Sequence, residues 1–247
     1  MAQLESGKPH SLKEIFCGEN DKIIVPDLQR DYCWGDHIPS NSTETLVSSF
    51  MDSLLKLDRS RDITMGLIYG YYDKELTPNH LQLCDGQQRL TTQFLILGVL
   101  NRKAGDDRYK DILISNFELE EDDKEPHLLY GIRESSLYFL SDLTIYYFLN
   151  SNLSLSDLDK QPWFLNSYNN DPTIISIKCA IETIEAKLAS NDDNEKPDIY
   201  SFGDFLIERL KFLFYDMNNR LNGEETFVVI NTTGEPLTAN QNLKPLI

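Results

Sequence analysis

The stretch that most constrains the fold of this chain runs from Leu81 to Lys103, because its hydrophobic period changes within a few residues. Leu81 to Cys84 has the apolar content of a buried strand. From Leu90 onward, apolar residues recur at helical spacing and end in a cationic cluster at 101–103 that suits a helix C-terminus. The Asp85-Gly86 pair lies between the two patterns. We therefore predict a strand that turns through a glycine into a helix, which indicates an α/β fold.

Further strands and helices are predicted on both sides of this joint. The expected strands are Ile23–Val25, Ile63–Tyr72, Leu213–Met217 and Thr226–Ile230, and the expected helices are Thr43–Leu57, Ser135–Leu149, Thr173–Leu188, Phe202–Leu210 and a last one from Ala239. Residues 103–201 indicate helices separated by polar loops, with a linker at 191–197.

This order predicts one discontinuous domain of the α/β (α+β) class with a mixed sheet at its core. Residues 1–102 would form the N-terminal part of the core, 103–200 a helical insertion or subdomain, and 201–247 the return to the core. We expect this last part to be cut off before any nuclease domain. The sequence has no repeat with a period of about 20 to 50 residues, which argues against a solenoid or propeller.

Charge limits the partners that such a chain can bind. Its 247 residues include 40 Asp and Glu against 23 Lys and Arg, giving a formal charge of −17. This excess opposes the counterion-release attraction of DNA, so DNA contact would need a local basic pocket or a partner. No apolar stretch approaches the roughly 20 residues of a membrane span, and no signal-peptide h-region opens the sequence. We therefore expect a cytoplasmic protein with no membrane partner.

Several common catalytic and metal-binding patterns are absent from the sequence. The 4 cysteines show no C-x-x-C spacing and are expected to be structural thiols. The 4 histidines form no zinc-binding pattern. Neither a G-x-S-x-G elbow nor an HNH-type motif is present, so the cutting residues of any complete nuclease would lie elsewhere.

The first candidate site is the predicted start of the helix after Asp85. Unpaired backbone N–H groups and the partial positive charge of a helix N-terminus would let Gln87, Gln88 and Arg89 cradle a phosphate beside Gly86. Asp85 could cap the helix, or it could hold a phosphate-bound Mg²⁺ ion or orient a water molecule. The residues alone leave both roles open.

The second candidate site is the loop from Pro26 to Trp34, which follows the first predicted strand. Gln29 and Arg30 supply an amide and a planar guanidinium, while Tyr32 and Trp34 supply large rings. Such a set suits phosphate pairing with base stacking. Equally, the two rings could pack in the core while Arg30 pairs with an acidic neighbour.

A secondary candidate is the polar turn from Ile230 to Thr238, placed between a predicted strand and a predicted helix. Asn231 and Thr233 would line it. Loops at the C-terminal ends of strands bind ligands in open α/β folds, although a strand-turn-helix joint needs no function.

Three segments, taken in order, resemble the signature of the GmrSD restriction endonuclease N-terminal domain family over nearly the whole chain. The pattern P-x-x-Q-R-x-Y-x-W is complete from Pro26 to Trp34, and D-G-Q-Q-R-L-T-T is complete from Asp85 to Thr92. The third segment, Phe227 to Lys244, contains the family's N-x-R-G turn without its arginine.

The resemblance implies a ParB/sulfiredoxin-like core with a nucleotide site, in a phage-defence system that restricts modified DNA together with a nuclease domain or partner subunit. Asp85 and Arg89 would be catalytic, with an NTP and Mg²⁺ as cofactors. The implied phosphate-binding residues are Gln29, Arg30, Gly86, Gln87, Gln88, Arg89 and Thr91. Three roles stay open: an NTPase coupled to DNA cleavage, a nucleotide- or DNA-binding module without turnover, and a regulatory interaction protein in which the motifs only preserve the fold.

Overall fold

The computed structural model of the protein describes residues 3–18, 22–27, 29–38, 41–73, 77–115, 124–150, 152–189 and 198–233. Its strands are β1 (Lys8–Ser11), β2 (Lys22–Val25), β3 (His37–Ile38), β4 (Asn41–Thr45), β5 (Ile63–Asp73), β6 (Thr77–Asp85), β7 (Leu128–Tyr130) and β8 (Leu210–Asp216). Its helices are α1 (Leu12–Cys17), α2 (Leu46–Leu55), α3 (Gln87–Ala104), α4 (Lys110–Leu113), α5 (Glu134–Leu143), the π-helix η1 (Thr144–Phe148), the 3₁₀-helices η2 (Leu155–Lys160) and η3 (Asn166–Asn170), α6 (Pro172–Leu188), α7 (Ile199–Glu208) and α8 (Arg220–Thr233).

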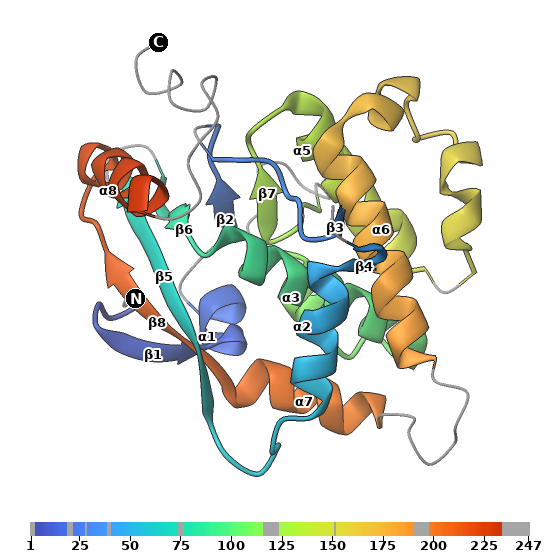
Figure 1. The fold of residues 1–247 in the computed structure, drawn as a ribbon, viewed down its shortest axis with the longest axis horizontal. Coiled ribbons are helices and arrows are strands. Elements are labelled where there is room, and N and C mark those ends of the chain that lie inside the picture. The colour runs from blue at the N-terminus through green and yellow to red at the C-terminus, as the bar shows by residue number, and fades with distance from the viewer. Residues whose placement is uncertain are drawn as a thin grey trace.

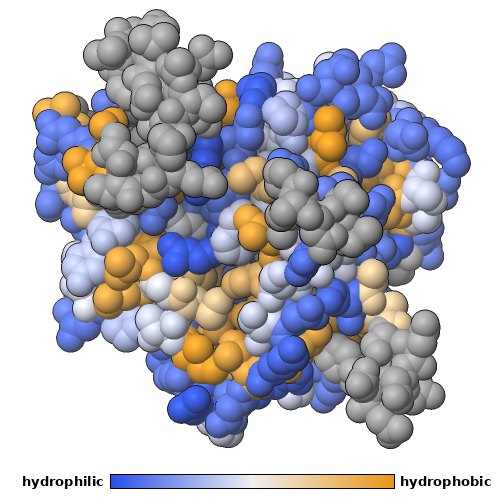
Figure 2. All heavy atoms as spheres, in the orientation of Figure 1, coloured by the Kyte–Doolittle hydropathy of each residue, from blue (hydrophilic) through white to orange (hydrophobic). Residues whose placement is uncertain are grey.

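The described strands form a mixed sheet of 6 strands in the order β1-β8-β5-β6-β2-β7 and a 2-stranded sheet of β3 and β4. Helices pack against the larger sheet and extend to one side of it (Figure 1). This architecture confirms the predicted α/β class. The face in Figure 2 is mostly hydrophilic, with hydrophobic residues gathered where β5 and β8 lie.

The sheet topology brings two of the candidate segments together. β2 pairs in parallel with both β6 and β7, with Ile24 opposite Gln82. Parallel strands end at the same edge of a sheet, so the loop after Val25 and the turn after Asp85 begin side by side. Open α/β sheets bind ligands at such an edge.

Helix α3 starts from this edge and runs through the centre of the molecule. Leu90, Phe94 and Leu97 are fully buried, and so is the polar Gln93. A helix that is buried all round belongs to the core, and α3 packs against α6, α7 and η1. Its N-terminus is therefore held rigidly relative to the sheet. Among the described residues, no helix combines the length and hydropathy that a membrane span requires.

Most predicted elements are confirmed, with shifts at their ends. The strands β2, β5, β6 and β8 and the helices α3, α5, α6 and α7 lie where the sequence indicates them. The helix expected from Thr43 begins later, because Thr45 ends β4 and caps α2 by accepting a hydrogen bond from the Ser48 amide at 3.1 Å. The linker at 191–197 and the helix from Ala239 lie outside the described residues.

The strand predicted at Thr226–Ile230 is wrong, because these residues continue α8. Their β-branched content favours a strand only weakly, and tertiary packing overrides it. A Cβ atom at Gly223 would lie 2.5 Å from the Cys84 sulfur, so α8 packs closely on the sheet through this glycine. Asn231 and Thr233 consequently lie at the end of α8 and not in a strand-to-helix turn, and their side chains are outside the described part.

The segment 103–200 also differs from the prediction, because it is not entirely helical. Leu128 to Tyr130 form β7, which pairs with β2 at the edge of the main sheet. A strand of 3 residues is too short to show an alternating pattern in the sequence.

Candidate functional site

A cavity of about 320 Å³ opens where the loop after β2 meets the start of α3. Its lining joins the first and second candidate sites, which are far apart in the sequence. The lining residues are Gln29, Arg30, Trp34, Asp85, Gly86, Gln87, Gln88 and Arg89. Of the predicted phosphate-binding residues, only Thr91 is not in this set.

The floor of the cavity is the N-terminus of α3. Gly86 occupies the N-cap position with a φ of 94°, in the left-handed region that suits glycine, and it has no side chain to cap the helix. The first intrahelical hydrogen bond runs from the Leu90 amide to the Gly86 carbonyl at 3.0 Å. The amides of Gln87, Gln88 and Arg89 therefore have no intrahelical acceptor. A helix start of this kind can bind an anion.

Arg89 is fixed against the sheet beside this floor. Its Nη2 donates to the Leu67 carbonyl at 2.8 Å and lies 3.7 Å from the Asp85 carboxylate. Gly66 has a φ of 127°, and a Cβ atom there would lie 2.3 Å from Arg89 Nη1. The glycine thus makes room for the guanidinium. Within the described residues, the Asp85 carboxylate pairs with Arg89 and accepts no hydrogen bond from the first turn of α3, so it does not act as a helix cap.

Three glutamines hold the loop after β2 over α3. Gln88 donates to the Asp31 carbonyl at 2.7 Å and accepts from the Cys33 amide at 3.0 Å. Gln87 donates to the Arg30 carbonyl at 2.9 Å, and Gln29 donates to the carbonyl of the β6 residue Cys84 at 2.9 Å. All three residues were predicted to bind phosphate, Gln87 and Gln88 through their backbone amides, and the structure shows that their side-chain amides join one motif to the other. These glutamines would therefore support ligand binding by fixing the shape of the cavity, and Gln87 and Gln88 would also offer their backbone amides.

Tyr32 and Thr91 also have internal roles. Tyr32 is fully buried, and its hydroxyl lies 2.8 Å from Thr92 Oγ1. Thr91 is likewise buried and lies 2.9 Å from the Tyr130 hydroxyl. Burial raises the pKa of the Tyr32 and Tyr130 hydroxyls well above the usual range for tyrosine, so both side chains stay neutral. A buried ring has no face for a base, and this corrects the stacking prediction for Tyr32 and the phosphate contact predicted for the Thr91 side chain.

Arg30 and Trp34 complete the wall of the cavity. Arg30 is half-buried, and its side chain forms no hydrogen bond or ion pair with any residue in the described ranges. Trp34 packs edge-on against Phe50, with ring centroids 5.2 Å apart, while it also lines the cavity. A cation and an aromatic ring therefore face the helix N-terminus.

The acidic residues of the site offer few ligands for a metal ion. Among the described residues that line the cavity, Asp85 is the one carboxylate. No group of 3 or more His, Cys, Asp and Glu side chains that could hold a metal occurs in the described part of the chain. A Mg²⁺ ion commonly uses one or two carboxylates together with substrate phosphates, so Asp85 fits an ion that arrives with a nucleotide.

A mixed α/β domain with a cationic cavity at a strand-to-helix turn is the class that this fold and site define. The family model for the GmrSD restriction endonuclease, N-terminal domain, matches residues 12–247, and the chain belongs to this family. Membership places the protein in a restriction system. Comparison with curated proteins found no match.

Proposed function

We propose that the cavity binds the phosphates of a nucleoside triphosphate, and that the bound nucleotide controls restriction of modified DNA by a nuclease domain or partner subunit. The observation that supports this proposal is the uncapped start of α3 facing Arg30 and Arg89 in one cavity of about 320 Å³. Backbone amides and guanidinium groups are the donors that phosphate oxygens prefer in proteins.

The residues of the site would have different roles in binding the nucleotide. The amides of Gln87, Gln88 and Arg89 and the guanidinium of Arg30 would donate to phosphate oxygens, while Arg89 would add positive charge from a fixed position. These donors offset locally the formal charge of −17 that repels anions from the molecule as a whole. Asp85 would hold a nucleotide-bound Mg²⁺ ion, which would neutralise phosphate charge, or would orient an attacking water molecule.

Calorimetric titration with ATP, GTP, CTP and UTP in the presence of Mg²⁺ tests the proposal. We expect a dissociation constant of about micromolar order for at least one nucleotide, weakened at least about tenfold by Arg30→Ala. Arg30 is a better probe than Arg89, because Arg89 also binds the Leu67 carbonyl and its loss would disturb the fold. Arg61→Ala is the matched control, since Arg61 is an exposed arginine outside the cavity lining.

Two results would contradict the proposal: no binding of any nucleotide, or equal binding by the Arg30→Ala variant and the unchanged chain. If a nucleotide binds, a measurement of phosphate release distinguishes an NTPase from a binding module without turnover. Turnover that Asp85→Asn abolishes, with binding retained, would indicate an NTPase. Binding without product would indicate a nucleotide-responsive module whose chemistry lies in the nuclease domain or partner subunit.

A further inference from the structure

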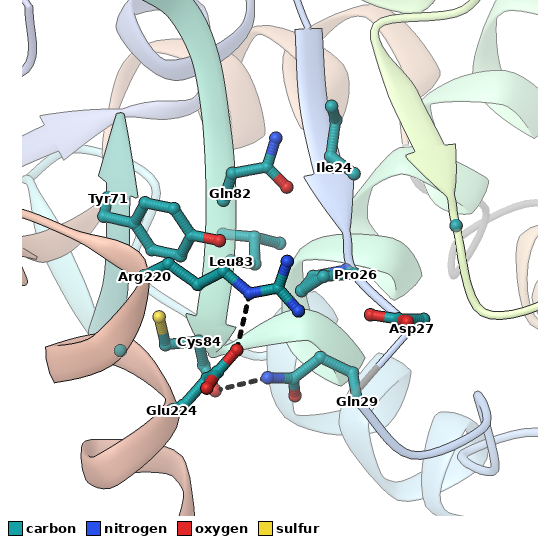
Figure 3. Close-up of a pocket in the computed structure, with 12 residues that line it drawn as sticks. Ile24, Pro26, Asp27, Gln29, Tyr71, Gln82, Leu83, Cys84, Arg220 and Glu224 are labelled. Carbon is teal, nitrogen blue, oxygen red and sulfur yellow. Dashed lines mark hydrogen bonds and ion pairs between the residues drawn. The ribbon is translucent and has the colours of Figure 1, made fainter. Parts of the chain in front are cut away.

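A second cavity, of about 350 Å³, adjoins the first through a shared lining residue, and Figure 3 shows the lining of this second cavity. It is formed by the end of β2, by β5 and β6, and by α8, and Gln29 lines both cavities. The Gln29 side chain is held in place by its hydrogen bond to the Cys84 carbonyl at 2.9 Å. None of the β5, β6 or α8 residues that line this second cavity was predicted as a binding or catalytic residue.

Part of the wall of this cavity is uncharged and apolar. Ile24, Pro26 and Leu83 contribute aliphatic surface, and the ring of Tyr71 borders the space (Figure 3). Burial raises the pKa of the Cys84 thiol to about 12, so this side chain stays neutral and unreactive at physiological pH.

Polar groups lie at defined points on these walls. The half-buried Gln82 points its amide into the cavity, and this amide has no hydrogen-bond partner within the described ranges (Figure 3). Arg220 donates through Nε to Glu224 at 2.5 Å, and the rest of its guanidinium extends toward Pro26. The cavity thus presents an amide that can both donate and accept, and a cation that is already partly neutralised.

This combination favours a neutral, planar ring with donors and acceptors on its edge. A phosphate would meet the carboxylates of Asp27 and Glu224, which also line the cavity. A purely aliphatic ligand would cover the Gln82 amide without giving it a hydrogen bond, which is unfavourable. A nucleobase satisfies both conditions, because glutamine and arginine side chains pair with base edges while aromatic and apolar walls contact the ring.

We infer that this second cavity is the base-binding half of the nucleotide site, with Gln82 and Arg220 as the residues that select the base. The inference rests on the proposed function, which places the phosphates against α3. The ribose would then pass over Gln29, the residue common to both cavities. The close contact of Gly223 with Cys84 and Tyr71 keeps α8 against the sheet and so closes this half of the site.

The test compares nucleotides with a ligand that has phosphates but no base. Binding of the four NTPs and of inorganic tripolyphosphate, each with Mg²⁺, is measured for the unchanged chain and for Gln82→Ala and Arg220→Ala. We expect each variant to weaken the preferred NTP at least about tenfold and to reduce discrimination among the four bases, with tripolyphosphate affinity unchanged. Arg220→Ala should fold normally, because its side chain is 68% exposed.

Gln161→Ala is the control, since Gln161 donates a single hydrogen bond to the Asp157 carbonyl far along the chain from both cavities. Unchanged base preference in both Gln82→Ala and Arg220→Ala would overturn the inference but leave the proposed function intact, provided that Arg30→Ala still weakens tripolyphosphate. Equal weakening of tripolyphosphate and NTPs by the Gln82 variant would also overturn it. If neither NTPs nor tripolyphosphate bind the unchanged chain, both the inference and the proposed function fail.

Discussion

At the scale of single residues, the site depends on a glycine outside the set of described residues that line the cavity. Gly66 lies within β5 and has a φ of 127°, where the register of β5 against β8 is shifted. An isolated glycine inside a strand pattern indicates a bulge or the close approach of another group. Here that group is the guanidinium of Arg89, which reaches the carbonyls of Met65 and Leu67 across the missing side chain.

Gly66→Ala should therefore impair nucleotide binding more than it impairs folding. Strain at this φ should cost about 1–3 kcal/mol, while the flexible end of Arg89 can move away from the new methyl group. We expect tripolyphosphate affinity to fall, because the displaced guanidinium no longer faces the cavity. Gly7→Ala is the control, since Gly7 has a φ of 78° with nothing within 4 Å of the added Cβ. Urea unfolding and calorimetry on both variants separate the effects, and equal affinity in the two would contradict this account.

Gln88 illustrates a role that only a folded structure can reveal. Its side chain is 5% exposed and bridges the Asp31 carbonyl and the Cys33 amide. Gln88→Ala leaves both backbone groups without this partner, so we expect a loss of about 1–3 kcal/mol in the free energy of unfolding, measured in urea. Gln161 is less buried and its side chain donates to one backbone carbonyl, that of Asp157, so Gln161→Ala should lower the free energy of unfolding by no more than about 0.5 kcal/mol. Equal losses would mean that the bridge does not stabilise the loop.

At the scale of elements, the sequence predicted the joint between β6 and α3 well, because a buried strand, a glycine and a helical period are all local signals. It also predicted that Arg30 and the start of α3 bind the same phosphates and, separately, that Trp34 stacks on a base, and in the structure these residues line one cavity. Hydrogen bonds from Gln87 and Gln88 to the β2 loop could not be predicted, because they join residues 57 positions apart. Strand β7 and helix α8 were missed for a related reason, since tertiary pairing and packing determine them.

Asp171 joins α6 to the start of α5, and its loss should be costly. This residue caps α6 by accepting from the Thr173 amide at 2.9 Å, binds Ser136 Oγ at 2.8 Å and pairs with Arg133 at 3.3 Å. Arg133 also pairs with Asp31 in the loop over the cavity. We expect Asp171→Ala to lower the free energy of unfolding by about 2–4 kcal/mol, because it removes a helix cap, the acceptor of the buried Ser136 hydroxyl and one of the two carboxylates that pair with Arg133.

Asp198→Ala provides the comparison for this prediction. Asp198 caps α7 through the Tyr200 amide at 3.1 Å but is exposed and makes no other side-chain contact of this kind in the described part. Its loss should cost about 1 kcal/mol, the usual value of a single cap. A loss at Asp171 no larger than the loss at Asp198 would show that the additional contacts of Asp171 contribute nothing to stability.

At the scale of the whole molecule, the segment 103–200 is connected to the sheet at several independent points. β7 extends the sheet beside β2, the Tyr130 hydroxyl meets Thr91 in α3, and α6 packs against α3. Gly35 approaches α6 so closely that a Cβ atom there would lie 1.9 Å from the Ser176 carbonyl oxygen. A subdomain with its own hydrophobic core would be stable without these contacts. If the segment 103–200 shares one core with the sheet, its stability depends on them.

We therefore predict that the segment 103–200 unfolds together with the rest of the chain. The 2 tryptophans report on the two parts, because Trp34 lies in the loop over the cavity and Trp163 stacks on Tyr146 within the segment. Trp34→Phe leaves Trp163 as the sole reporter, and Trp163→Phe leaves Trp34. Within each variant, the fluorescence transition in urea should coincide with the loss of far-ultraviolet circular dichroism, as two-state unfolding requires. A Trp163 signal that changes at lower urea than the circular dichroism would identify 103–200 as a separately folding subdomain, since the six-stranded sheet would then survive without it.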